Sequence, residues 1–239
     1  MPPEPRLVPR FMAEPPQEPL PYGRWAERLQ AEFLAAALRL DASGADLGEP
    51  GEVAWFPDRS WHGRTYVPAS ASTSTRLELF GFVWFVGTPE EEPAEFGAYA
   101  DFTAETAAQH PEWQLDLCDE VIGGWRGERG RQAAITLVWG SSLVAGGAIA
   151  TAELADVTVD QCPLVENRFT LLAPDDYGGD YLEVRLYNGR GDELARESLY
   201  EESADDEDED EDAEAGAPGG SSGADSPGPG EESRGPGSP

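Results

Sequence analysis

The clearest hydrophobic pattern near the start of the chain has the period of an α-helix. Between Gly23 and Leu40, apolar side chains recur every three or four residues, at Trp25, Leu29, Phe33, Ala36 and Leu40. This spacing places them on one face of a helix, and Leu34 and Leu38 widen that face. Arg28 and Glu32 lie away from it. The sequence therefore predicts one amphipathic helix over residues 23–40.

After this helix the pattern changes to short segments rich in aromatic and β-branched residues, separated by Gly, Pro or Asn-Gly turns. The candidate strands are 76–86, 96–103, 113–118, 133–139, 148–153, 157–162, 168–172, 181–187 and 193–199. Short strands at this spacing are typical of antiparallel sheets that pack on each other or close. We therefore expect a mainly β fold, an antiparallel β-sandwich or barrel of about nine strands with one N-terminal amphipathic helix.

The last two candidate strands carry the strongest pairing signal. Across residues 182–187, Leu, Val and Leu alternate with Glu, Arg and Tyr, and Asn188-Gly189 follows. Alternation with period two indicates a strand with one buried face, and Asn-Gly is a preferred hairpin turn. The sequence predicts a β-hairpin here, with Leu182, Val184 and Leu186 facing inward.

Residues 133–152 allow a second interpretation because they form 20 consecutive residues without a charge. Their length suits a membrane span. Their composition opposes it, since only seven of the 20 are Ile, Leu, Val or Trp and several are Gly, Ser or Thr. Two strands joined near residues 141–147 explain the segment more simply. A single-span membrane protein remains a lesser alternative.

Composition divides the chain into three parts. Residues 1–21 contain eight prolines, which predicts an extended linker because proline fixes φ and lacks an amide donor. Residues 22–200 have the length of a single domain. Residues 201–239 hold 14 of the 47 acidic residues, eight of them consecutive at 205–212. Because this tail has no large apolar residue, we expect it to be disordered.

The net charge of −31 limits the partners that the chain can have. Nucleic acids and anionic membranes both require basic surfaces, so we expect neither of them as a partner. A basic protein is the partner that such a charge attracts. The N-terminal region has no apolar run of the kind found in signal peptides, which predicts a cytoplasmic location. The sequence gives no prediction of oligomeric state.

The densest group of side chains suited to recognition lies at residues 55–66. It comprises Trp55, Asp58, Arg59, Trp61, His62, Arg64 and Tyr66. Pro57 and Gly63 predict that much of this segment is a loop, and aromatic and arginine side chains on loops offer large contact areas. We take these residues as candidate binding residues. In the alternative interpretation, the rings close one end of the β-structure and Arg59 or Arg64 pairs with a carboxylate.

The sequence shows no recognisable metal, cofactor or catalytic motif. The nearest His–Cys pair, His110 and Cys118, is eight residues apart, whereas zinc sites usually contain closer pairs. Glycine-rich phosphate loops and nucleophile elbows lack a supporting context. With two histidines and no lysine, the chain has few of the usual general bases and amine nucleophiles. We therefore predict no metal and no cofactor, and favour a non-enzymatic role.

The favoured function is a protein-binding module, in which the acidic tail steers a basic partner and residues 55–66 provide recognition. The alternative is a small-ligand-binding or hydrolytic enzyme that uses Asp58 and His62 as an acid–base pair in the mouth of a barrel. Carboxylates of Asp116, Asp119 or Glu120 would assist it. Geometry separates the two, because the enzyme requires Asp58 and His62 to meet in a concave pocket.

Overall fold

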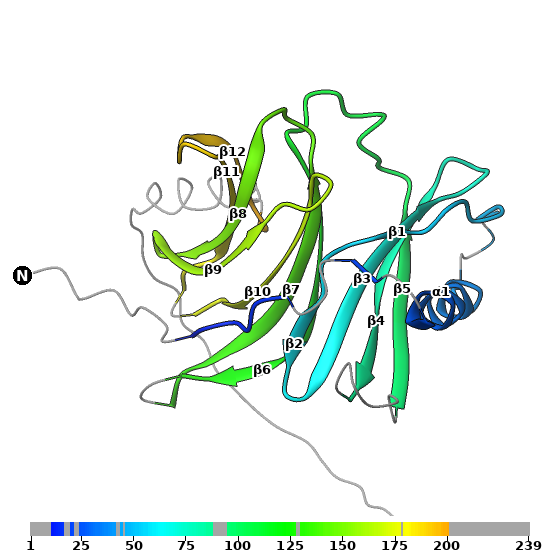
Figure 1. Ribbon diagram of the computed structural model, residues 1–239, viewed down its shortest axis with the longest axis horizontal. Helices are drawn as coiled ribbons and strands as arrows, with labels where there is room; N and C mark the ends of the chain where they lie inside the picture. Colours follow the sequence, from blue (N-terminus) through cyan, green and yellow to red (C-terminus); the bar gives the residue numbers. More distant parts are fainter. Residues whose placement is uncertain are drawn as a thin grey trace, which may run out of the picture. The chain divides into compact units, whose positions relative to one another are not determined.

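The protein has a mainly β fold, seen in a computed structural model that describes residues 11–16, 20–21, 24–41, 44, 46–87, 95–127, 130–177 and 179–200. Within these ranges it contains one helix and twelve strands, which form three antiparallel sheets (Figure 1). The predicted acidic tail at 201–239 lies outside the described residues, as do residues 1–10 of the predicted linker.

Each sheet is built from strands that lie close together in the sequence. The first sheet contains β1 (Ala54–Trp55), β2 (Arg59–Trp61), β3 (Arg64–Ser72), β4 (Glu78–Val86) and β5 (Glu95–Thr103), in the order β1-β3-β4-β5 with β2 also beside β3. The second contains β6 (Leu115–Arg126), β7 (Gln132–Ser142) and β10 (Arg168–Asp175), in the order β10-β7-β6. The third contains β8 (Gly147–Leu154), β9 (Val157–Pro163), β11 (Leu182–Asn188) and β12 (Glu193–Ser198), in the order β12-β11-β8-β9.

The nine predicted strands are all present, as β4 to β12, but the expected total is too low. The structure adds β1, β2 and β3 within residues 54–72. The prediction that much of residues 55–66 is a loop holds only for residues 56–58 and for the turn at 62–63, and the rest of the segment belongs to strands. β1 and β2 pair in turn with β3, so residues 54–61 form one interrupted edge strand.

The predicted helix is α1 (Arg24–Ala37), which ends three residues before the expected Leu40. Its buried face carries Leu29 and Phe33 as expected, while Leu38 lies beyond the helix end and is 85% exposed, contrary to the prediction. On the outer face, Arg28 and Glu32 form an ion pair one turn apart. The apolar stripe packs against β4 and β5 of the first sheet.

Three hydrophobic cores join the helix and the sheets in series. One lies between α1 and the first sheet, a second between the first and second sheets, and a third between the second and third sheets. β4 shows how alternation produces this order. Val83 faces the helix, whereas its neighbour Phe82 faces Trp139 of the second sheet, with ring centroids 6.3 Å apart. The first and second sheets are therefore covered on both faces.

The hairpin predicted near the end of the chain is β11–β12, which are paired antiparallel. Leu182, Val184 and Leu186 are fully buried against the second sheet, as the alternation predicted. The intervening Glu183, Arg185 and Tyr187 lie on the opposite, outer face of the third sheet.

Residues 133–152 contribute to two strands, β7 and β8, as the simpler interpretation predicted. The two strands belong to different sheets, so the segment crosses from the second sheet to the third. The alternative of a single helical span at this position is contradicted. Among the described residues, the one helix is too short and too polar to cross a membrane.

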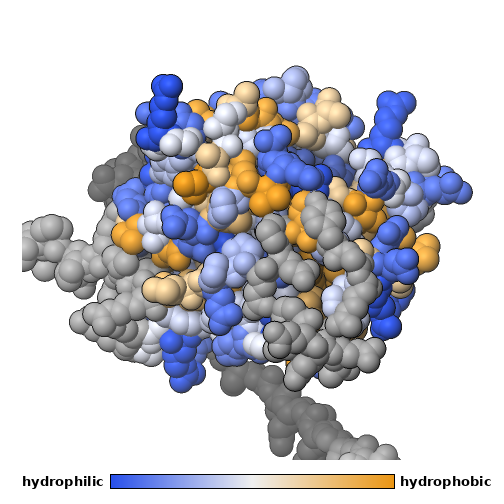
Figure 2. Space-filling view, in the orientation of Figure 1, coloured by the Kyte–Doolittle hydropathy of each residue, from blue (hydrophilic) through white to orange (hydrophobic). Residues whose placement is uncertain are grey.

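Large hydrophobic side chains that remain exposed are spread over the surface. On the face in Figure 2, small hydrophobic patches are separated by polar residues. In the described part of the chain the exposed examples are Met12, Leu38, Val121, Leu143, Ile149, Tyr181 and Tyr200. Met12, at 89%, is the most exposed of them, and it lies next to the predicted binding segment.

Candidate functional site

The predicted binding segment folds into the β2–β3 hairpin. Trp61 pairs with Arg64, which leaves His62 and Gly63 as a two-residue turn. Both have positive φ, 50° and 76°, as a type I′ turn requires. Glycine adopts this conformation without strain, whereas histidine does so less readily. The turn holds the imidazole at the exposed end of the hairpin.

Three of the predicted residues face the interior. Arg59 is fully buried, Asp58 is 5% exposed and Tyr66 is 3% exposed. The Tyr66 ring packs edge-on against Phe82 in the core between the first and second sheets. Asp58 lies close to the third sheet. Burial raises the pKa of the Cys162 thiol there, and the charge of Asp58 adds to this effect.

Arg59 connects all three sheets. Its Nε donates to the carbonyl of Thr170 in the second sheet, and Nη2 donates to the carbonyl of Gln161 in the third, at 2.9 and 3.1 Å. Nη2 also lies 3.1 Å from the Asp160 carboxylate, and Nη1 donates to the carbonyl of Glu14 at 3.0 Å. We call this group of contacts the Arg59 clasp. It provides the carboxylate pairing that the alternative interpretation allowed for Arg59.

Asp160 completes the clasp. Its carboxylate accepts the N–H of Leu172 at 2.8 Å and faces Arg59. Burial raises the pKa of Asp160 to about 6, although the Arg59 guanidinium and the N–H groups of Leu172 and Gln161 act in the opposite direction. Removal from water thus outweighs the favourable contacts of the charged carboxylate.

The remaining predicted residues divide between the helix side and the hairpin end. Trp55 is half-buried against α1, 6.3 Å from the Phe33 ring. At the other end, Trp61 is half-buried, and its ring centroid lies 4.5 Å from that of His62 with the two rings tilted by 33°. The exposed Arg64 lies over the Trp84 ring, 4.4 Å from its centroid. Trp61, His62 and Arg64 are therefore the members of the set that lie together at the exposed end of the hairpin, whereas Trp55 lines a separate pocket of about 350 Å³.

Trp61 and His62 border a surface hollow of about 520 Å³, whose rim also carries Met12, Glu14 and Ser60. The hollow lies between the hairpin and the N-terminal segment. Trp61 forms its aromatic wall, and the ring is held from behind by Phe11, with centroids 5.6 Å apart. Aromatic and methionine side chains around a hollow of this size are typical of protein-binding surfaces.

The proposed acid–base pair is not assembled around this hollow. Asp58 is buried and is not among the residues that line the hollow, whereas His62 occupies the exposed turn, and the three residues of β2 lie between them. The β6 carboxylates Asp116 and Asp119 line a separate pocket of about 280 Å³, which shares no lining residue with the hollow beside His62.

The β6 pocket was not predicted as a site, although it contains Asp116 and Asp119. Cys118 of the same strand also lines it, together with Glu78 of β4 and Trp113. Burial raises the pKa of Asp116 and of Glu78, and the charge of Asp116 raises that of Glu78 further.

Asp119 and Glu120, further along β6, interact with different neighbouring residues. The pKa of Asp119 is raised by burial and by Asp175 of β10. Glu120 lies near Tyr99 of the first sheet, where burial, Glu120 and Asp101 all raise the pKa of the phenol. Among the described residues no group of three or more His, Cys, Asp or Glu side chains could hold a metal ion.

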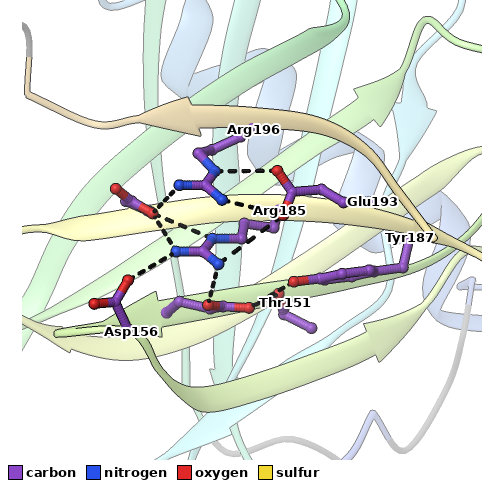
Figure 3. A network of polar contacts seen from close by, with 8 residues as sticks. Thr151, Asp156, Arg185, Tyr187, Glu193 and Arg196 are labelled. Carbon is purple, nitrogen blue, oxygen red and sulfur yellow. Dashed lines mark hydrogen bonds and ion pairs between the residues drawn. The ribbon is translucent and has the colours of Figure 1, made fainter. Parts of the chain in front are cut away.

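The outer face of the third sheet carries a network of ion pairs around Arg185 (Figure 3). Four carboxylates surround this guanidinium, from Glu153, Asp156, Glu183 and Glu193, at 2.8 to 4.0 Å. Tyr187 and Thr151 donate hydrogen bonds to Glu153. Every acceptor faces a donor from a neighbouring strand, so this network, which we call the Arg185 network, fastens the sheet.

Comparison of the chain with protein-family models, with curated proteins and with solved structures finds no match.

Proposed function

We propose that this chain is a non-enzymatic protein-binding module that recognises a basic partner protein at the exposed end of the β2–β3 hairpin. The observation that carries the proposal is the hollow formed by Trp61, His62 and Met12, on the side of the hairpin that faces solvent. Aromatic and methionine side chains provide large contact areas, and such residues dominate the energy of protein interfaces.

Charge supplies the second part of the proposal. The chain has a net charge of −31, and the eight consecutive acids at 205–212 concentrate part of it in one stretch of sequence. Such a field attracts a basic protein and raises the association rate, whereas the affinity comes from the buried contacts at the hollow. The mechanism predicts that salt slows association strongly and changes dissociation much less.

In this proposal the scaffold is a sandwich of packed sheets. The hydrophobic cores between the sheets stabilise the fold, and the β2–β3 hairpin lies at the edge of the first sheet. A cytoplasmic location is part of the same proposal and rests on the sequence alone. The enzyme alternative receives no support from a specific contact, because Asp58 and His62 are separated along the strand.

The proposal is tested with three baits in an extract of the source cells: the full chain, the full chain carrying His62→Asn, and residues 1–200. We expect the full chain to retain a basic protein at low salt, and the other two baits to retain less of it. His62→Asn removes the imidazole but keeps the turn, because Asn-Gly also forms type I′ turns. A retained protein is then purified and titrated. Equal retention by all three baits at both low and moderate salt would contradict the proposal.

A further inference from the structure

The segment of residues 11–16 lies across the junction of the first and second sheets, drawn in dark blue in Figure 1. Its burial alternates: Phe11 and Ala13 pack against the core between these sheets, whereas Met12 is 89% exposed. Alternate burial is the pattern of an extended peptide lying in a groove. Residues 11–16 belong to no strand, so side chains rather than a ladder of hydrogen bonds hold the segment.

The groove has two defined points of contact. Phe11 sits between two tryptophans, 5.6 Å from Trp61 of the first sheet and 6.1 Å from Trp125 of the second. Three residues along, the carbonyl of Glu14 accepts a hydrogen bond from the buried Arg59. An aromatic anchor followed by a recognised backbone carbonyl is how extended peptides are commonly bound.

The receiving side is formed by the rest of the chain. Trp125 packs on Tyr177, at 5.4 Å, and a side chain at Gly123 would approach the Trp61 indole to 3.3 Å. Glycine at this position therefore lets Trp61 lie against β6. The hollow of about 520 Å³ continues directly beside Met12 and Glu14, so the groove is wider than the segment now within it.

Residues 11–16 contain one charged side chain, Glu14, but basic residues come directly before them in the sequence. Arg10 immediately precedes Phe11, and Arg6 lies four residues further back, in a chain with 47 acidic residues and 16 basic ones. A basic residue followed by an aromatic one would combine attraction by the acidic protein with the anchor position.

We propose that the groove between Trp61 and Trp125 is a peptide-binding groove, which the chain's own residues 11–16 occupy as an internal, displaceable ligand. The external ligand is an extended segment of a basic partner protein, with Arg or Lys directly before an aromatic residue and a small residue two positions after it. This inference rests on the proposed function and names the partner's recognised segment. A tethered occupant competes with any external peptide, so the groove is autoinhibited.

The test measures binding of a fluorescent synthetic peptide, residues 6–16 of this chain, to the full chain by fluorescence anisotropy. Phe11→Ala weakens the internal occupant and keeps both Trp61 and Trp125, so we expect this variant to bind the peptide about tenfold or more tightly than the unmodified chain does. Leu38→Ala is the control, because it also removes an exposed apolar side chain but lies beyond the end of α1, outside the groove and the hollow, and we expect it to behave like the unmodified chain. A peptide that itself lacks the phenylalanine should not bind.

A second variant, Ala13→Asp, keeps the test decisive if Phe11→Ala is poorly folded. It places a charge on the inward side of the segment and removes no atom from the groove. Thermal unfolding monitors both variants. Peptide affinity that is unchanged in a folded variant would overturn the inference. Loss of folding in both variants would also overturn it, because the segment would then be an integral part of the core.

The peptide-binding test and the test of the proposed function can fail independently of each other. Peptide binding together with no basic protein retained from the extract would keep the groove and reject a basic partner. A basic partner retained in a His62-dependent way, together with no peptide binding, would keep the module and reject the groove as its binding site.

Discussion

Two arginines that bind carboxylates occupy very different parts of this protein. Arg59 is fully buried where three sheets meet, and its principal partner Asp160 has a side chain that is 7% exposed. Arg185 lies on the outer face of the third sheet, its side chain 11% exposed. Its partner Glu153 is only 7% exposed, but Asp156 and Glu183 are 72% and 36% exposed. Arg185 has more carboxylates around it, yet more of its surroundings are in water.

The difference teaches that the number of ion pairs is a poor guide to their importance. Water and neighbouring charges can replace any one partner of Arg185, so a single loss is partly compensated. Arg59 is itself fully buried and donates to three backbone carbonyls, through a buried hydrogen bond to Thr170 and half-buried ones to Glu14 and Gln161. Removing it leaves the buried Thr170 carbonyl and the buried Asp160 carboxylate without their donor.

Arg59→Met should therefore produce the largest loss. We expect the free energy of unfolding to fall by about 3–5 kcal/mol, as is usual when one partner of a buried ion pair is removed. Denaturation with urea measures it. The matched control is Arg64→Met, the same substitution in the same hairpin. The Arg64 guanidinium is exposed and lies over the face of the Trp84 ring, so its loss should lower the free energy of unfolding by about 1 kcal/mol. Equal losses for the two variants would refute the distinction.

The sequence predicted most of the fold, because β4 to β12 and α1 follow the hydrophobic periodicities of strands and helices. It missed β3, whose residues 64–72 are rich in Ala and Ser and contain Pro68. Proline removes a donor from the ladder, which normally argues against a strand paired on both sides. Pro68 lies opposite the gap between β1 and β2, where its carbonyl accepts the N–H of Phe56. Because the edge strand is interrupted there, the N–H that proline lacks is not needed for pairing.

The clasp could not be predicted from residue patterns. Arg59 occupies a buried position of β2, where a charged residue is rare. Its charge therefore breaks the alternation of apolar and polar residues by which a strand is recognised in a sequence. Asp160 was missed for a different reason. Alternation with Val157 and Val159 would point it outward, but the register shifts within the β8–β9 pair, and Asp160 lies opposite the buried Ala152. Such an irregularity is a property of the pairing of the two strands, and one strand's sequence alone does not reveal it.

The second prediction uses pH to sharpen the comparison. The pKa of Asp160 is raised from 3.8 to about 6 by burial. Between these values the folded chain keeps a proton that the unfolded chain has lost, so the free energy of unfolding falls as the pH rises through this window. For Asp160 alone the change is about 3 kcal/mol at most.

Urea denaturation at several pH values between 4 and 7 measures this dependence, with Asp160→Asn as the control. The other carboxylates are common to both chains, so their contributions cancel in the difference. Relative to Asp160→Asn, the unmodified chain should gain stability as the pH falls. Parallel profiles would show that Asp160 titrates with an ordinary pKa and that the clasp is more open to water than its burial indicates.

Arg185→Met should have an intermediate effect. Its removal leaves Glu153, Glu183 and their neighbours facing one another, and we expect a loss of about 1 kcal/mol at low salt. Asp156, Glu183 and Glu193 are exposed enough to be screened, so the repulsion among these carboxylates should shrink in 1 M salt, where the Debye length is about 3 Å. The cost of Arg59→Met should stay nearly constant. The comparison fails if salt affects both variants to the same extent.

His62→Asn should have the smallest effect on stability and a clear effect on binding. The imidazole is exposed and contacts the tilted Trp61 ring, so the stability change should stay within about 0.5 kcal/mol. Asparagine adopts positive φ more readily than histidine does, which offsets the lost ring contact. Thermal unfolding and titration of the retained partner measure the two quantities on the same preparation. Trp61→Ala is the informative contrast: its ring supports both the hollow and Phe11, so it should lower stability and binding together. If His62→Asn also lowered both, the hairpin end would belong to the packed interior with Arg59, and recognition would have to be sought elsewhere on the surface.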